Sequence, residues 1–138
     1  MRLLMSEDLF QEILDHCRRE APLEACGLVA GKNGRALKVY RLTNAETSPV
    51  KYLIKPEEQF KAMDDMERRG QELLAIYHSH PATQAYPSER DIRMAFYPDV
   101  SYLIVSLQGE VKARLFRIVE GEVYPETLEI VPAKGLAE

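Results

Sequence analysis

Residues 72–91 constrain the fold more than any other part of the chain. An apolar segment, residues 72–77, has the length and composition of a buried central strand and runs directly into His78 and His80. Shortly afterwards a helix is predicted over residues 88–97, with polar side chains in its first turn. The chain is therefore expected to combine strands and helices, with polar side chains gathered where a strand ends and a helix begins.

The polar residues of this segment have the spacing of a metal site. His78 and His80 are two positions apart, so on an extended backbone their imidazoles project from the same face. Asp91, near the start of the predicted helix, can return as a third ligand. Two nitrogens and one carboxylate oxygen leave the fourth position of a tetrahedral zinc to water, which is typical of catalytic sites. Zinc lowers the pKa of such a water from about 16 towards about 7. We therefore expect one zinc ion with a catalytic water.

Each of these residues also has a simpler interpretation. A His-x-His pair often arises by chance. Ser88 can cap the predicted helix through its hydroxyl, and Asp91 is favoured in the first turn by the helix dipole. Only the combination of His78, His80 and Pro81 with Ser88 and Asp91 favours a metal site.

The first half of the chain predicts a helix followed by a hairpin. A helix over residues 6–20 is expected to begin at Ser6 and to carry an apolar stripe, with His16 outside the stripe and exposed. Asn33-Gly34 is a strong hairpin signal between strands at residues 26–31 and 35–43. Leu37 and Val39 of the second strand are expected to face inward.

Further elements are predicted on both sides of the central strand. A short strand is expected at residues 52–54, and a helix is expected to begin at Glu57 and Glu58 and to end near Gly70. Side chains expected to face the core are Phe60 and Met63 in that helix and Phe96 in the helix over 88–97. Three strands follow, over residues 100–107, 111–119 and 122–131, and the tail from Pro132 is expected to fray.

These elements predict an α/β fold in one domain. A chain of 138 residues is large enough for a single core and too short for two. The expected architecture over residues 1–138 is a sandwich of three layers, in which helices flank a mixed, largely antiparallel sheet.

Composition excludes several classes of function. The net charge of −4 and a pI near 5.5 oppose a nucleic-acid partner. No apolar run approaches the roughly 20 residues of a membrane span, and the N-terminal residues do not form a signal peptide. Cys17 and Cys26 form no disulfide framework. We expect a cytoplasmic protein with both thiols reduced.

The motifs resemble those of the JAMM, or MPN+, metalloprotease family. His78-Ser79-His80-Pro81 and Ser88-x-x-Asp91 match its H-[ST]-H-P-x6-S-x2-D signature, and the segment from Glu24 to Leu28 is similar to its E-x-C-G-L stretch. The resemblance covers essentially the whole domain and implies the JAMM/MPN fold, which is cytidine deaminase-like. It also implies residue roles: zinc ligands at His78, His80 and Asp91, a general base at Glu24, and an oxyanion-binding hydroxyl at Ser88. Cys26 at this position is interpreted as a small buried thiol and not as a nucleophile.

The resemblance implies a small prokaryotic member, a deubiquitinase-like peptidase or isopeptidase. Its expected substrate is the bond next to the C-terminal tail of a ubiquitin-like or sulfur-carrier protein. Two alternatives remain: a non-catalytic MPN-type scaffold, and a RadC-like protein associated with DNA, which shares H-x-H-P-x6-S-x2-D. The acidic balance and Glu24-x-Cys26-Gly27 oppose the second. The physiological substrate, the bond type and the oligomeric state stay open.

Overall fold

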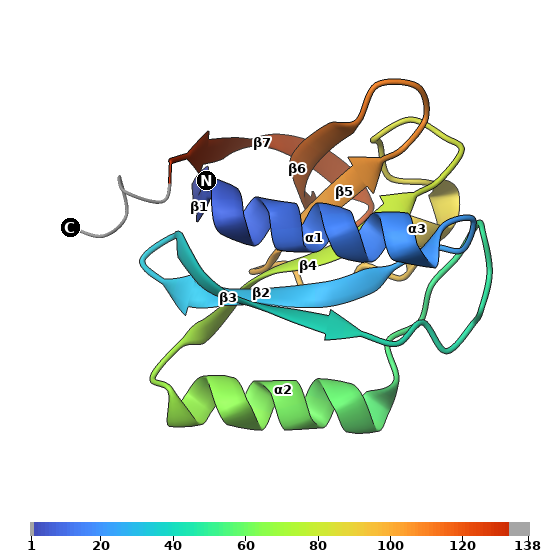
Figure 1. Ribbon diagram of the computed structural model, residues 1–138. Helices are drawn as coiled ribbons and strands as arrows, with labels where there is room; N and C mark the ends of the chain where they lie inside the picture. The colour runs from blue at the N-terminus through green and yellow to red at the C-terminus, as the bar shows by residue number, and fades with distance from the viewer. Residues whose placement is uncertain (1, 133–138) are drawn as a thin grey trace.

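The computed structural model of the chain describes residues 2–132, in which seven strands and three helices are built around one sheet (Figure 1). Along the chain the elements are β1 (Arg2–Ser6), α1 (Glu7–Glu20), β2 (Cys26–Lys32), β3 (Arg35–Leu42), α2 (Pro56–Arg68), β4 (Glu72–His80), α3 (Glu89–Arg93), β5 (Ser101–Ser106), β6 (Lys112–Val119) and β7 (Glu122–Val131).

The sheet is mixed and closes on itself in the order β1-β3-β2-β4-β5-β6-β7. Four neighbouring pairs are antiparallel, and the pairs β4–β5, β1–β7 and β1–β3 are parallel. The predicted mixed, largely antiparallel sheet is thus confirmed. Its closure depends on β1, which the sequence analysis did not predict because this strand is short, stands at the chain end and leads directly into α1.

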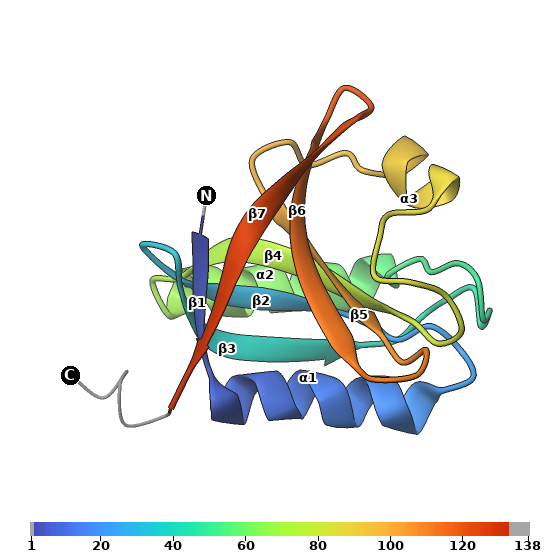
Figure 2. The same ribbon diagram turned by 90° about the horizontal axis from the view of Figure 1, so that it is seen from above.

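Helices cover both faces of the sheet, which confirms the expected α/β architecture in a single domain. Helix α1 lies on one side of β2, β3 and β4 and helix α2 on the other, while β7 crosses the sheet and ends beside the start of α1 (Figures 1 and 2). Each face has its own apolar cluster. Ile13 and Cys17 of α1 pack with Tyr77 on one face, and Met66 of α2 packs with Ile76 on the other.

Helix α1 begins as predicted, but the prediction for His16 was wrong. The Ser6 hydroxyl accepts a hydrogen bond from the Leu9 N–H at 3.3 Å. His16 is buried, and its Nδ1 lies 2.6 Å from the hydroxyl of Tyr77. The closed sheet surrounds more of the helix than a single apolar stripe, so a polar side chain next to Cys17 also reaches the interior.

Gly27 of β2 allows the Tyr77 ring to lie against the sheet. A Cβ at this position would approach the Tyr40 carbonyl oxygen to 2.2 Å and the Tyr77 ring to 2.3 Å. The hairpin predicted at Asn33-Gly34 is confirmed, because both residues have positive φ (53° and 75°) and β2 pairs antiparallel with β3.

Several other expectations differ from the structure. Phe60 is 75% exposed because α2 packs through Ala62 and Met66 on its opposite side; Met63 is also exposed. Phe96 is 68% exposed because α3 ends at Arg93, well before residue 97.

Smaller differences occur in β3 and in the loop after it. Leu37 points to solvent, while Val39 is buried as expected. Instead of a strand at residues 52–54 there is a single bridge between Asn44 and Ile54. Of the tail expected to fray from Pro132, residues 133–138 lie outside the described part of the chain. Within residues 2–132, no helix combines the length and apolar character that a bilayer crossing needs.

Candidate metal centre

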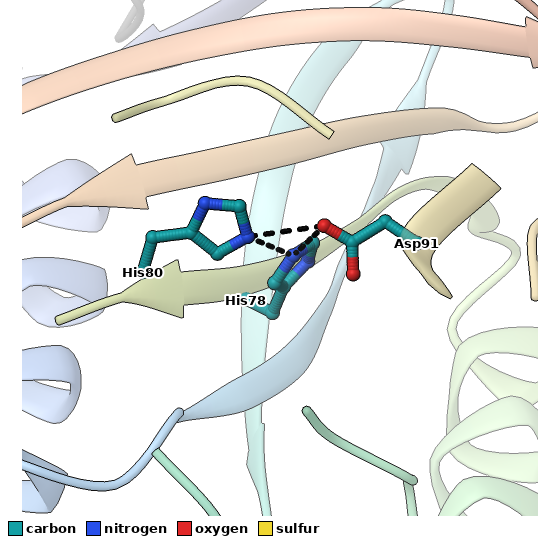
Figure 3. A group of neighbouring side chains, drawn as sticks. All are labelled: His78, His80 and Asp91. Atoms are coloured by element: carbon teal, nitrogen blue, oxygen red, sulfur yellow. Dashed lines mark hydrogen bonds and ion pairs between the residues drawn. The ribbon is translucent and has the colours of Figure 1, made fainter. Parts of the chain in front are cut away.

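The two histidines lie at the end of a central strand. β4 runs between β2, with which it is antiparallel, and β5, with which it is parallel, and both partners support it up to the histidines. His78 and His80 alternate with Ser79 and therefore face the same side of the sheet. Helix α3 presents Asp91 to them, since its first turn lies over this end of β4 (Figure 3).

Three ligand-type atoms converge at this point. His78 Nε2 and His80 Nε2 are 3.1 Å apart, and they lie 3.1 and 3.0 Å from Asp91 Oδ2 (Figure 3). All three side chains are buried. Among residues 2–132 they form the group of histidine, cysteine and carboxylate side chains whose ligand atoms are close enough to hold a metal ion together.

This arrangement fits a zinc ion. Bonds of about 2.0–2.1 Å to a tetrahedral zinc would separate the ligand atoms by about 3.3 Å, close to the distances observed. Two imidazole nitrogens at 3.1 Å also need a shared proton or a cation between them. A donor set of two nitrogens and one carboxylate oxygen is that of catalytic zinc sites.

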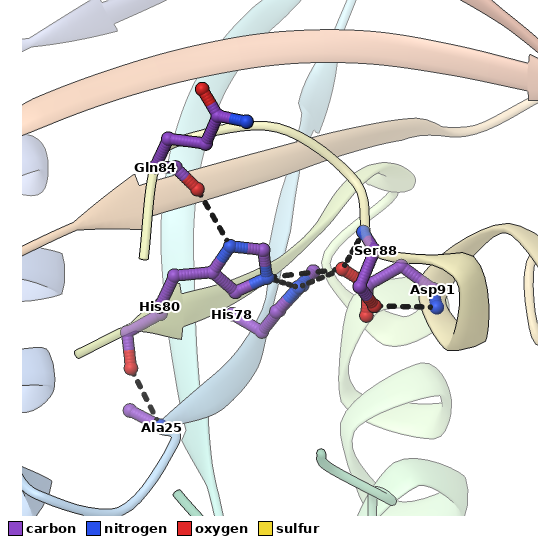
Figure 4. A network of polar contacts seen from close by, with 7 residues as sticks. Ala25, His78, His80, Gln84, Ser88 and Asp91 are labelled. Carbon is purple, nitrogen blue, oxygen red and sulfur yellow. Dashed lines mark hydrogen bonds and ion pairs between the residues drawn. The ribbon is translucent and has the colours of Figure 1, made fainter. Parts of the chain in front are cut away.

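Neighbouring groups orient two of these side chains. His80 Nδ1 donates to the Gln84 carbonyl oxygen at 2.8 Å, which leaves Nε2 without a hydrogen and directed at Asp91 (Figure 4). The Ser88 N–H donates to Asp91 Oδ2 at 2.9 Å. The His78 ring stacks on Tyr52 with centroids 4.4 Å apart, and its buried Nδ1 has no hydrogen-bond partner in the described part of the chain.

The electrostatics favour a neutral imidazole beside an ionised carboxylate. Burial lowers the pKa of His78 below its usual value. Burial opposes ionisation of Asp91, but its close contacts with the His78 and His80 imidazoles and with the Ser88 N–H outweigh burial and hold the pKa of Asp91 well below its usual range. Burial acts to lower the pKa of His80, but its contacts with Asp91 and the Gln84 carbonyl outweigh burial and raise this pKa above its usual value. A metal ion requires both imidazoles to be neutral and the carboxylate to be ionised, so its binding would displace the proton that these contacts favour on His80.

Glu24 lies next to this centre, in the connection between α1 and β2. Because Cys26 pairs with His78 in an antiparallel ladder, Glu24 stands level with His80. Its side chain is 3% exposed, and its Oε1 is buried without a partner in the described residues. Burial raises the pKa of Glu24 to about 8. A buried carboxylate with an unpaired oxygen is well suited to exchange protons.

The backbone around Glu24 is fixed from both sides. The Ala25 N–H donates to Ser79 Oγ at 2.8 Å, and the Ser79 N–H donates to the Ala25 carbonyl oxygen at 3.0 Å. On the other side, the Glu24 N–H donates to the Ser48 carbonyl oxygen at 2.8 Å, and Asn44 Nδ2 donates to the Glu24 carbonyl oxygen at 3.0 Å. The position of the carboxylate therefore depends on two other parts of the chain.

Ser88 caps helix α3. Its hydroxyl oxygen accepts the Asp91 N–H at 3.0 Å, and the Asp91 carboxylate accepts the Ser88 N–H, which together form a capping box. The capping interpretation of Ser88 is thus confirmed. Because the hydroxyl acts here as an acceptor, its hydrogen is left to donate to another group.

The structure adds residues that the sequence analysis did not single out. Tyr52 stacks on His78, Asn44 holds the Glu24 carbonyl, and Ser79 holds Ala25. Of these three residues, Ser79 could most readily have been predicted, because it lies between the two histidines of the motif. Tyr52 and Asn44 are distant in sequence and carry no local signal, because their contacts depend on how the loop between β3 and α2 returns to β4.

Comparison with known proteins identifies the family. Residues 6–119 match the domain family described as "Prokaryotic homologs of the JAB domain". The chain belongs to this family. The resemblance to JAMM or MPN+ proteins indicated by the motifs is thereby confirmed.

Relatives of the chain include proteins with named activities. A CysO-cysteine peptidase of Mycobacterium tuberculosis is 40% identical over 133 residues, which cover 94% of this chain and 91% of the relative. A probable TtuB-protein conjugate cleaving protease of Thermus thermophilus is 41% identical over 121 residues, which cover 87% of this chain and 78% of the relative. A protein of Desulfitobacterium hafniense with a solved structure is 36% identical, and its structure matches with a TM-score of 0.86. The match covers 96% of this chain and 94% of that protein.

Proposed function

We propose that the protein is a zinc-dependent peptidase or isopeptidase that hydrolyses the bond next to the C-terminal tail of a ubiquitin-like or sulfur-carrier protein. The observation that carries this proposal is the convergence of His78 Nε2, His80 Nε2 and Asp91 Oδ2 beside the buried carboxylate of Glu24. A scaffold that lacks metal ligands gives no reason for three buried polar side chains to meet in this way.

His78, His80 and Asp91 are the proposed zinc ligands. When bound, zinc would polarise the scissile carbonyl and make hydroxide available near neutral pH. Gln84 holds His80 in the tautomer that directs Nε2 to the site, and the Ser88 N–H orients the Asp91 carboxylate.

Glu24 and Ser88 are the proposed catalytic residues. Glu24 takes a proton from the attacking water and later delivers it to the leaving amine, for which its buried, unpaired Oε1 is placed. The Ser88 hydroxyl donates a hydrogen bond to the oxygen that becomes negative in the transition state. Both side chains lie beside the three ligands without being part of the ligand group.

The proposed substrate class is supported by the relatives. Two proteins that align with most of this chain are named for cleaving a CysO-cysteine bond and TtuB-protein conjugates. The net charge of −4 supports protein rather than nucleic acid as the partner. The buried, free thiols of Cys17 and Cys26 fit a reducing compartment, and we propose the cytoplasm.

The test is hydrolysis of a sulfur-carrier or ubiquitin-like protein whose C-terminal tail is extended by one amino acid or by an isopeptide-linked lysine. We expect the zinc-loaded protein to release the extension. Glu24→Gln should lower kcat by about 10²–10⁴-fold with zinc still bound, because only proton transfer is removed. His78→Ala should lose both zinc and activity.

A matched control is Glu20→Gln, which removes an exposed carboxylate of α1 and should leave hydrolysis unchanged. Absence of any released product from every such fusion, or equal activity of the wild type and Glu24→Gln, would refute the proposal.

A further inference from the structure

A small apolar pocket opens beside the candidate metal centre. Its volume is about 140 Å³, and it is formed by the loop after β3, by α2, by β4 and by the segment from α3 to β5. Its floor consists of the buried side chains of Ile54, Ile76 and Tyr102. None of the described residues that line it carries a charge. Such a pocket suits an uncharged, apolar group.

The pocket and the metal centre occupy consecutive positions on one strand face. Ile76 and His78 are two residues apart on β4, so their side chains project from the same face about 6.6 Å apart. Tyr52 lines the pocket and also stacks on the His78 ring, with centroids 4.4 Å apart. A ligand bound at the metal therefore extends into the pocket without crossing another element.

The walls of the pocket are held in place, and its rim is apolar. Gln59 Nε2 donates to the Tyr97 hydroxyl at 3.0 Å, and the Tyr97 N–H donates to the Tyr102 hydroxyl at 3.2 Å. At the rim, Leu53 is 42% exposed and Phe96 is 68% exposed. Exposed large apolar side chains around a preformed hollow are typical of a binding surface.

The position of Glu24 gives the direction in which a substrate lies. Glu24 stands level with His80, whereas Ile76 lies on the other side of His78 along β4. The leaving amine must be close to Glu24 to receive a proton. The acyl part of the substrate, which is the carrier tail, therefore extends from the metal centre towards Ile76.

We infer that this pocket binds an apolar side chain at the third residue before the scissile bond of the carrier tail, an assignment that rests on the proposed function. An extended chain advances about 3.3 Å per residue, so the residue two positions before the one at the metal lies over Ile76. Side chains of alternate residues point the same way, towards the sheet. The side chain of the third residue is therefore the one that reaches the pocket, and glycine at the first and second positions would leave it as the only side chain near the metal centre.

The test uses synthetic peptides that end in X-Gly-Gly, joined through an amide bond to an aminocoumarin reporter. For the zinc-loaded protein we expect kcat/KM to be at least about tenfold higher with leucine or valine at X than with alanine, aspartate or lysine. Leu53→Asp places a carboxylate at the rim and should shift the preference at X from leucine to lysine. Val50→Asp, which alters a 69% exposed residue of the same loop that does not line the pocket, should keep the preference of the wild type.

A binding measurement separates this inference from the proposed function. Peptides ending in X-Gly-Gly with a free carboxylate are titrated calorimetrically into the zinc-loaded Glu24→Gln protein, with and without Leu53→Asp. If the peptide with leucine at X binds more tightly than the others, and Leu53→Asp abolishes this difference, the pocket is supported. This holds even if no amide is cleaved, because absence of cleavage would refute only the proposed hydrolase function. Cleavage or binding that does not depend on X, or an equal shift in Val50→Asp, overturns the pocket and leaves the proposed function standing.

Discussion

At the scale of single residues, Ser79 links the histidine strand to the proposed base. It is buried between His78 and His80, and its side chain points away from them to accept the Ala25 N–H at 2.8 Å. Its own N–H donates to the Ala25 carbonyl oxygen at 3.0 Å. Ala25 follows Glu24 directly, so these two hydrogen bonds fix the carboxylate relative to the proposed metal ligands.

We predict that Ser79→Ala destabilises the protein and slows hydrolysis while zinc still binds. The substitution leaves the buried Ala25 N–H without an acceptor, which costs about 1–3 kcal/mol in the free energy of unfolding. Ser79→Thr keeps the oxygen and should retain most of the activity. Urea unfolding, zinc content and kcat of the three proteins test this. A kcat for Ser79→Ala equal to that of the wild type would show that the contact does not position Glu24.

The individual residues also show what the sequence could predict. Asp91 could be assigned beside the histidines because a strand end and a helix start each have a known geometry over a few residues. The burial of His16 could not be predicted, because it depends on Tyr77, 61 positions away, and on the curvature of the whole sheet.

At the scale of elements, the loop between β3 and α2 is organised by Asn44. Its Nδ2 donates to the carbonyl oxygens of Glu24 and Lys51, both at 3.0 Å. Its Oδ1 accepts the N–H groups of Glu46 and Leu53, also both at 3.0 Å. One side chain therefore closes the loop that carries Tyr52 and ties this loop to the proposed base.

We predict that Asn44→Ala lowers both stability and kcat. Loss of four hydrogen bonds, three of them partly buried, should cost about 2–4 kcal/mol, and kcat should fall at least about tenfold because Glu24 is no longer held. The matched control is Thr43→Ala, since the hydroxyl of Thr43 donates to Glu58 on α2, away from the site. Equal kcat values for both variants and the wild type would contradict this function of the loop.

Helix α1 should make stability depend on pH through His16. Burial lowers the pKa of His16 below 6.5, against an opposing contribution from Glu20, while Arg19 and Arg41 act in the same direction as burial. The unfolded chain then binds this proton more readily than the folded chain. The contribution of His16 to the free energy of unfolding is therefore fully present above about pH 6.5. It is lost as the pH falls below this value, by at most about 1.4 kcal/mol per pH unit.

Subtracting His16→Gln from the wild type isolates this contribution. The free energy of unfolding of the wild type minus that of His16→Gln is measured in urea between pH 8 and pH 5. This difference should be constant above pH 7 and should decrease below pH 6.5, because only the wild type loses the contribution of neutral His16. The other two histidines are present in both proteins and cancel. A difference that does not change over this range would mean that burial does not keep His16 neutral in the folded chain.

The elements themselves divide into those with local signals and those without. The Asn33-Gly34 hairpin and the strands β5 to β7 were predicted closely because turn residues and alternation are local. β1 was missed and α3 is shorter than predicted, because closure of the sheet and the segment from Met94 to Val100 are determined by tertiary packing and not by helical periodicity.

At the scale of the whole molecule, the site joins segments that only the complete fold brings together. The proposed base precedes β2, two ligands end β4, and the third opens α3. Buried His78 and Asp91 are polar groups that destabilise the folded chain unless they are paired. A bound cation should therefore act on the stability of the entire domain, and not only on activity.

We predict that zinc raises the unfolding temperature of the whole chain. A ligand that binds only the folded state, at a free concentration about 1,000 times its Kd, stabilises by about 4 kcal/mol, which corresponds to roughly 14 °C for a domain of this size. Scanning calorimetry of the zinc-loaded and chelator-treated protein measures the shift, with one zinc per chain by elemental analysis. His78→Ala should unfold at the same temperature with and without zinc. If zinc still raised the unfolding temperature of His78→Ala, the ion would bind at another site. If zinc did not raise the unfolding temperature of the wild type, it would not stabilise the fold through these buried residues.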